Sequence, residues 1–136
     1  SSDVCSSDLV YMRANKKTRY SIRKAQKAKV NILDSNRDNL EIYYEMLDET
    51  FQRSSGKLPS KKLLESCFDI LEPKNMIAFN MAYYQEEPIA GLITIFFKDR
   101  AYYWSGAGFD SHRYLQSNSL LFWEAIKKSN LNPNDK

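Results

Sequence analysis

Apolar and polar positions alternate with a helical period in the first half of the chain and with a strand period in the second half. Apolar side chains recur at helical spacing over residues 40–51 and 63–71. The composition then becomes β-rich, with polar turns between the segments. The predicted strands are 76–84, 88–98 and 101–105. Short turns between successive strands predict an antiparallel meander that follows the helices.

A shorter amphipathic helix is predicted over residues 16–29, before these elements. Ile22, Ala25 and Ala28 share one face, and basic side chains spaced by four residues share another. Residues 30–33 are β-rich and are followed by turn residues, which predicts a short strand. The predicted order is therefore helix, strand, two helices, three strands and a final helix.

Capping residues set the expected helix boundaries. Ser35 and Asp38 have the spacing of a capping box before the second helix. Ser60 is expected to cap the third helix, which Pro73 ends, and Asn118 the last helix. The inner face of the third helix is expected to hold Leu63, Leu64, Cys67, Phe68, Ile70 and Leu71.

The strands differ in their expected burial. Residues 89–97 are apolar on both faces, so this strand is expected at the centre of the sheet, covered on each side. Tyr102, Tyr103 and Trp104 follow in the next strand, and at least one of them is expected to face the core. Residues 106–108 are expected to begin an irregular stretch. The last helix is apolar nearly all round, so it is expected to be deeply buried.

Composition fits one globular domain. The chain has 136 residues, of which 43% are hydrophobic and 27% are charged. No apolar run approaches the ~20 residues of a membrane span, which favours a soluble cytoplasmic protein. Residues 1–9 resemble translated sequencing-adapter DNA, so we expect a non-native segment there, including Cys5. Residues 10–136 are expected to be the N-terminal portion of a single domain. Cys67 is expected in the core.

Charge is distributed unevenly. Eight basic residues and no acidic residue occur from Arg13 to Lys29, whereas 12 basic and 15 acidic residues follow. This asymmetry indicates an anionic ligand near the first helix, such as phosphate or RNA, or else a solvated helix face. No paired-carboxylate, serine-histidine or metal-binding pattern is visible. His112, the single histidine, is expected to be a solvated loop residue.

Five motifs in order resemble the FemAB family of the GNAT superfamily, which includes peptidoglycan-bridge aminoacyltransferases and BioF-type acetyltransferase domains. The first motif is the arginine-bearing helix and the second is a threonine-x-x-arginine. The next two lie in the meander and the last lies in the final helix. In this sequence they are 18–30, Thr50-Phe51-Gln52-Arg53, Pro88-Ile89-Ala90-Gly91, 101–107 and 121–126.

The resemblance implies an α/β (α+β) GNAT-like fold, a mixed sheet with an antiparallel central meander between helices. It also implies transfer of an acyl or aminoacyl group to an amine, such as that of a peptidoglycan precursor in cell-wall synthesis. The donor would be aminoacyl-tRNA or acyl-CoA, with no other bound cofactor. The alternatives are a non-catalytic module that binds phosphate or RNA, and an inactive truncated fragment.

Two departures from the family qualify this expectation. Residues 113–118 replace the R/Q-x-x-G-x-G/A loop that holds a pyrophosphate and lack its glycines, which argues against tight binding of coenzyme A. The late lysine-bearing segment of the family has no counterpart, so we expect an active site and a sheet that are incomplete at the carboxyl-terminal side. Catalytic residues stay unassigned.

The expected substrate-binding residues are Arg19, Arg23, Arg53 and Tyr103. The resemblance implies that the three arginines hold a diphosphate or a tRNA backbone, which suits the bidentate guanidinium group. Arg53 has an alternative role as a charge that caps a helix end. Tyr103 would donate a hydrogen bond in the acceptor pocket, or else pack in the core. No metal ligand is predicted, and the oligomeric state is left open.

Overall fold

The computed structural model describes residues 16–54, 56–98 and 100–129, and four strands within them form one antiparallel sheet. The predicted meander and the short strand before it are confirmed. The strands lie side by side in the order β1-β2-β3-β4. Their bounds are Asn31–Asp34 (β1), Ile77–Tyr84 (β2), Glu87–Phe97 (β3) and Arg100–Gly108 (β4).

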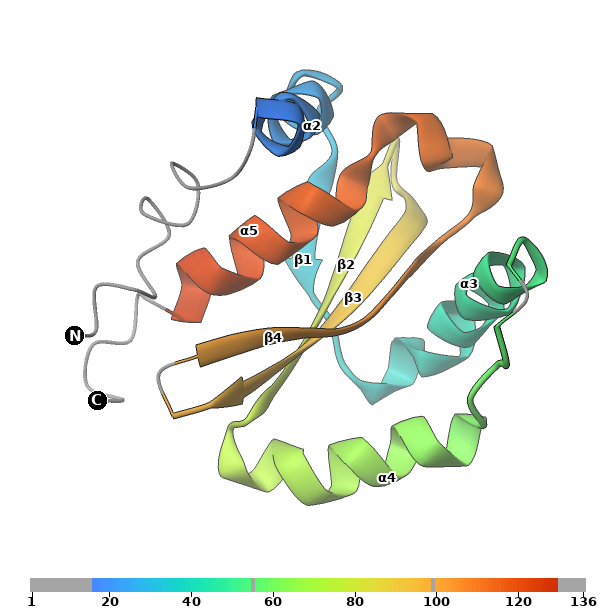
Figure 1. The fold of residues 1–136 in the computed structure, drawn as a ribbon, viewed down its shortest axis with the longest axis vertical. Helices are drawn as coiled ribbons and strands as arrows, with labels where there is room; N and C mark the ends of the chain where they lie inside the picture. The colour runs from blue at the N-terminus through green and yellow to red at the C-terminus, as the bar shows by residue number, and fades with distance from the viewer. Residues whose placement is uncertain (1–15, 55, 99, 130–136) are drawn as a thin grey trace.

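Helices cover both faces of this sheet, as expected. The helices are α2 (Lys16–Lys27), α3 (Leu40–Gln52), α4 (Lys61–Leu71) and α5 (Ser117–Ser129). Short 3-10 helices are η2 (Arg37–Asn39), η3 (Glu72–Lys74) and η4 (Asp110–Leu115). Figure 1 shows α2 and α5 on one side of the sheet and α3 and α4 on the other. The expected α/β architecture is confirmed.

Each face of the sheet has its own hydrophobic core. Alternate residues of β2 and β3 point to opposite faces, so one strand supplies both cores. Ala82, Ala90 and Leu92 pack under α2 and α5. Phe79, Met81 and Ile93 pack under α3 and α4. The burial of β3 from Ile89 to Thr94 confirms that it is a central strand covered on both sides.

Two expected caps are wrong and one is confirmed. Asn36, not Ser35, caps the turn before α3, because its side-chain oxygen accepts from the Asp38 amide at 2.9 Å. The last helix begins at Ser117, so Asn118 lies inside its first turn instead of capping it. Ser60 caps α4 as expected, accepting from the Leu63 amide at 3.1 Å.

Helix α4 buries a narrower stripe than expected. Leu64 and Phe68 are buried, Cys67 is half-buried, and Leu63 and Ile70 are 48% and 60% exposed. Residues 64 and 68 are one turn apart, whereas 63 and 70 lie seven positions apart and so share one side of the helix, roughly 100–120° away from residue 64. The expected burial of Leu63 and Ile70 is therefore wrong.

Strand β4 is longer and more exposed than expected. It continues through Gly106 to Gly108, where an irregular stretch was expected. A register shift opposite Ile93 and Thr94 leaves Trp104 as an extra residue, which is a β-bulge. Tyr102, Tyr103 and Trp104 are 36–49% exposed, so none of them lies in the core as expected. The reason is that β4 is the last strand of the described sheet and has a neighbour on one side only.

In the described part of the chain, no helix has the length and apolar character needed to cross a bilayer. The predicted non-native segment, residues 1–9, lies outside the described residues, as does Cys5.

Candidate functional site

The open edge of β4 presents backbone groups that have no strand beside them in the described sheet. Residues of an antiparallel edge strand alternate between bonding to the neighbour and facing outward. The Phe109 amide donates to the Ile89 carbonyl oxygen at 2.9 Å, which sets the phase of this alternation. Ser105 and Ala107 share that phase and bond to β3. The backbone N–H and C=O of Gly106 therefore face the open edge.

Tyr103 lies against Gly106 on the α5 side of the sheet. A β-carbon added to Gly106 would lie 2.0 Å from the Tyr103 hydroxyl oxygen, so only glycine leaves room for this ring position. The side-chain amide of Asn118 donates to the same hydroxyl oxygen at 3.4 Å. Phe122 packs edge-to-face on the Tyr103 ring, with centroids 5.5 Å apart. We call Tyr103, Gly106 and Asn118 the Tyr103 cluster.

The phenol of Tyr103 is a neutral hydrogen-bonding group at ordinary pH. Burial raises the pKa of Tyr103, and the hydrogen bond from Asn118 offsets part of that rise. On the other face of β4, the Tyr43 hydroxyl oxygen lies 2.5 Å from Ser105 Oγ. Burial also raises the pKa of Tyr43. Two protonated phenols therefore flank the bulged segment of β4 from opposite sides.

A buried hydroxyl group lies next to the Tyr103 cluster. Thr94 is the cross-strand partner of Tyr103 and is fully buried. Among the described residues, its hydroxyl oxygen has no hydrogen-bond partner. Buried polar groups in folded proteins are almost always hydrogen-bonded. This part of the α5 face is therefore more polar than a simple packing core.

The end of α3 is tied to the end of β4. The Gly108 amide donates to Thr50 Oγ1 at 3.4 Å, which satisfies an outward-facing group of the strand. Arg53 Nη1 lies 2.9 Å from Asp110 Oδ1, and the Asp110 amide donates to Glu49 Oε1 at 3.0 Å. The threonine-x-x-arginine motif thus joins a helix to the segment that leads into α5. Arg53 is engaged in this ion pair.

The basic helix α2 lies on the α5 side of the sheet. Its buried residues are Ser21, Ile22 and Ala25, and α2 packs along α5. Arg19 and Arg23 both interact within the molecule. Since α2 and α3 cover opposite faces, Arg19 and Arg23 are not brought together with Arg53 (Figure 1).

The segment before α5 turns through a left-handed residue and is tied to α2. Gln116 has a φ of 55°, the left-handed conformation that glycine adopts without strain. Its side-chain oxygen accepts from the Ser21 hydroxyl at 2.8 Å, which ties the loop to α2. No acidic residue lies in the first turn of α5. The segment has no glycine, so the expectation of weak pyrophosphate binding stays a prediction.

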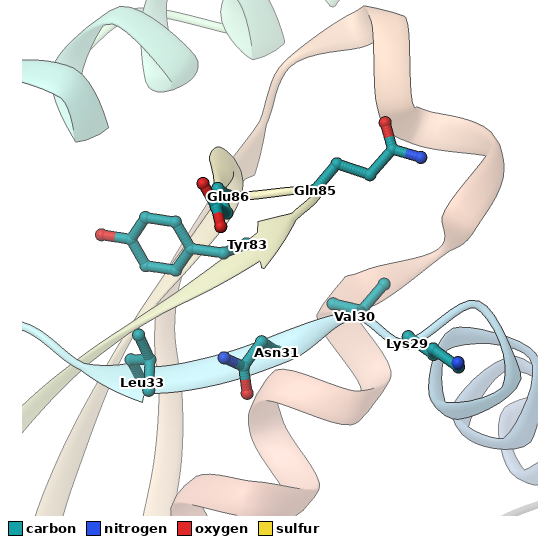
Figure 2. A pocket seen from close by; sticks show the side chains of 7 residues that line it. All are labelled: Lys29, Val30, Asn31, Leu33, Tyr83, Gln85 and Glu86. Atoms are coloured by element: carbon teal, nitrogen blue, oxygen red, sulfur yellow. The ribbon is translucent and has the colours of Figure 1, made fainter.

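Figure 2 shows an open pocket at the opposite edge of the sheet, between β1 and the turn from β2 to β3. It is lined by Lys29, Val30, Asn31, Leu33, Tyr83, Gln85 and Glu86. None of the expected site residues lines it. Since β2 and β3 separate β1 from β4, this pocket is distinct from the Tyr103 cluster.

His112 and Cys67, two other side chains that can be reactive, are both half-buried. His112 lies between the rings of Tyr84 and Tyr114, with centroid distances of 5.8 and 6.4 Å. It is half-buried, so the solvated position expected for it is only partly correct. Burial raises the pKa of the Cys67 thiol, which keeps it protonated and weakly nucleophilic. In the described ranges, no group of three or more acidic, histidine or cysteine side chains is arranged to hold a metal ion.

Of the four expected binding residues, Tyr103 is the one that the structure places at the open edge. Sequence reasoning missed Asn118, which it assigned to a cap, and Gly106, which it assigned to a loop. The available signal was Gly106, which closely follows the aromatic residues 102–104. Glycine in a strand often marks a site where another group approaches the backbone closely.

Solved structures with the same fold support the architecture. The crystal structure of FemX matches with a TM-score of 0.83 over 93% of this chain, at 12% sequence identity. A possible acetyltransferase from Clostridium difficile 630 matches with a TM-score of 0.53 over 73% of this chain, also at 12% identity. The matches cover 48% of FemX and 69% of the C. difficile protein, so the chain spans about half the length of FemX.

The sequence itself matches a family model. A comparison with curated proteins gave no match. The model for the acetyltransferase (GNAT) domain matches residues 12–130, which is most of the chain. That range includes every described strand and all the residues of the Tyr103 cluster. The chain therefore belongs to the GNAT acetyltransferase domain family, and its fold is shared with FemX.

Proposed function

We propose that this domain takes part in transferring an acyl or aminoacyl group to an amine, with the reacting groups bound along the open edge of β4. The observation that carries this proposal is the Tyr103 cluster. Its neutral hydroxyl group lies beside Gly106, whose backbone faces that edge. Membership of the GNAT acetyltransferase domain family supports acyl transfer as the type of reaction.

Gly106 and Tyr103 each supply something that acyl transfer needs. An amine that attacks an ester or thioester requires an oriented carbonyl group and stabilisation of the negative charge on its oxygen. The outward N–H of Gly106 is a fixed donor that such an oxygen can use. Tyr103 donates from its hydroxyl group to the acceptor substrate beside it. No side chain is assigned as the base that deprotonates the amine.

The basic helix supports an anionic part of the substrate. Arg19 and Arg23 lie one turn apart on α2, next to α5 and η4. Guanidinium groups bind phosphate oxygens with good geometry. We propose that they bind the phosphates of a tRNA-borne donor or of a phosphate-bearing acceptor such as a peptidoglycan precursor. Arg53 contributes through its ion pair with Asp110, by holding the segment before α5 in place.

The segment before α5 bears on the class of donor. Gln116 and Asn118 occupy positions where a coenzyme A pyrophosphate loop carries small residues, and both side chains make hydrogen bonds within the protein. These contacts favour aminoacyl-tRNA over acyl-CoA as the donor. A weak acyl-CoA site at the α5 amides is the alternative, and the assay below separates the two.

The test is a transfer assay on the full-length protein with matched panels of aminoacyl-tRNAs and acyl-CoAs. We expect turnover with aminoacyl-tRNA, and we expect Tyr103→Phe to lower kcat by about 10- to 100-fold, because the hydrogen bond that orients the acceptor substrate is lost. Tyr102→Phe is the control, since its ring lies on the neighbouring position of the same strand. Failure to transfer from either panel would refute the proposal.

A second candidate function rests on the charge of the first helix. If α2 only binds RNA or phosphate, affinity should fall steeply with salt concentration and should not depend on the peptide part of an acceptor. Binding by that criterion, without turnover in the assay above, would favour the non-catalytic module.

A further inference from the structure

The hydrogen bond between Asn118 and Tyr103 sets the direction of a proton. The Asn118 side-chain nitrogen is the donor and the Tyr103 oxygen is the acceptor, at 3.4 Å. An amide nitrogen cannot accept, so the hydroxyl hydrogen of Tyr103 must point elsewhere. Phe122 covers one side of the ring, and Gly106 lies under the hydroxyl oxygen. The hydrogen can therefore point away from Asn118, toward the open edge of β4.

We infer that Asn118 is a positioning residue: by donating to the Tyr103 oxygen, it holds the Tyr103 hydroxyl hydrogen toward the open edge of β4, where a bound substrate receives it. This inference rests on the proposed function, since it assigns a residue to the same site. Asn118 acts only through Tyr103 and does not itself touch the substrate.

Three features of the cluster support this role. The Tyr103 ring fits only because residue 106 is glycine. The Tyr103 hydroxyl group approaches the backbone of residue 106 more closely than side chains normally do in a strand. A β-carbon at 106 would also lie 3.1 Å from the Asn118 side-chain nitrogen, so all three residues meet at one point. Asn118 lies in the first turn of α5, a rigid element that fixes the donor.

Two opposing effects act on the pKa of Tyr103. Burial raises its pKa and the Asn118 bond lowers it. Among the described residues, Tyr43 lies across β4, where its hydroxyl group is hydrogen-bonded with Ser105, and it interacts electrostatically with Tyr103. Burial raises the pKa of Tyr43 and a charge on Tyr103 raises it further, so Tyr43 keeps its proton while Tyr103 titrates.

The direct test is the pKa of Tyr103, measured by NMR on full-length protein with labelled tyrosine rings and assigned with Tyr103→Phe. We expect Asn118→Leu to raise this pKa, because the donor that stabilises the phenolate is lost. Asn118→Asp should raise it further, because a carboxylate repels the phenolate. Ser119→Ala, one residue along the same helix turn, should leave it unchanged. A lower pKa in Asn118→Leu would overturn the inference, since it would mean that Asn118 accepts from the hydroxyl.

Gly106→Ala supplies the second test. Its β-carbon displaces the Tyr103 hydroxyl from Asn118, so in this background Asn118→Leu should no longer change the Tyr103 pKa. An equal rise in both backgrounds would show that the apolar leucine, and not the lost hydrogen bond, causes the shift. That result would also overturn the inference.

Activity separates this inference from the proposed function. If the protein transfers acyl groups, Asn118→Leu should lower kcat about tenfold with a smaller change in KM, and Ser119→Ala should change neither. Shifted pKa values without any transfer by the unmutated protein would refute the proposed function and leave the role of Asn118 in orienting Tyr103 intact. Transfer that is unaffected by both Asn118 variants would refute that role.

Discussion

Two glycines in neighbouring strands make room for two tyrosines, in different ways. Gly91 in β3 faces the buried Tyr43, and an added β-carbon would lie 2.7 Å from Tyr43 Cδ1 and 2.9 Å from Met81 Sδ. Gly106 in β4 faces Tyr103, which is 49% exposed. The first contact lies inside a packed core, whereas the second lies at a surface where the side chain can move.

This difference predicts effects of different size for the same substitution. Gly91→Ala should destabilise the fold by about 1–3 kcal/mol, because neither the Tyr43 ring nor Met81 has free space to move into. Gly106→Ala should change the free energy of unfolding by less than about 1 kcal/mol, because Tyr103 can rotate toward solvent. Denaturant unfolding of the two variants measures both values. Equal losses would contradict the assignment of Tyr43 to a tightly packed core.

Helix α3 and strand β4 are joined by one neutral and one charged contact. Thr50 accepts from the Gly108 amide, a backbone group that the open edge would otherwise leave without a protein partner. Arg53 pairs with the exposed Asp110, where water competes for both charges. The neutral contact is therefore expected to contribute more to stability than the ion pair.

We predict that Thr50→Val costs about 1–2 kcal/mol of unfolding free energy, because the shape is kept and the Gly108 amide loses its acceptor. Arg53→Ala should cost less than about 1 kcal/mol. Thermal or denaturant unfolding of the two variants tests the order. If Arg53→Ala proved the more destabilising change, the ion pair would have to be the main link between α3 and η4.

At the scale of the molecule, a four-stranded sheet separates two cores within the described residues. Ile22 belongs to the core under α2 and α5, and Ile93 belongs to the core under α3 and α4. The two residues belong to separate cores on opposite faces of the sheet. Their contributions to stability should therefore be independent.

We expect Ile22→Val and Ile93→Val to cost about 0.5–1.5 kcal/mol each. The double variant should equal the sum within about 0.5 kcal/mol. As a matched comparison, Ile93→Val combined with Leu47→Ala, both in the core under α3 and α4, should depart from additivity if the two side chains share a cavity. Strong coupling between Ile22 and Ile93 would show that the two cores are not separated by the sheet.

Local patterns in the sequence were enough for most of the elements. The period of apolar residues gave α3 and α4, the β-rich segments gave β2 and β3, and Ser60 gave the start of α4. These features depend on neighbours a few residues apart, which a single sequence contains. The expected antiparallel meander followed from the short turns between strands.

Contacts between distant residues determined the rest. Tyr103, Gly106 and Asn118 form a cluster because a bulge in β4 and the path of η4 bring the start of α5 over that strand. Asn118 resembles a helix cap in the sequence because the same polar side chain suits a cap and a hydrogen bond to a phenol. The local pattern thus specified the helices and strands, and the packing of α5 on β4 gave their polar residues a common site, because hydrogen bonds form between groups that are close in space whatever their separation in the chain.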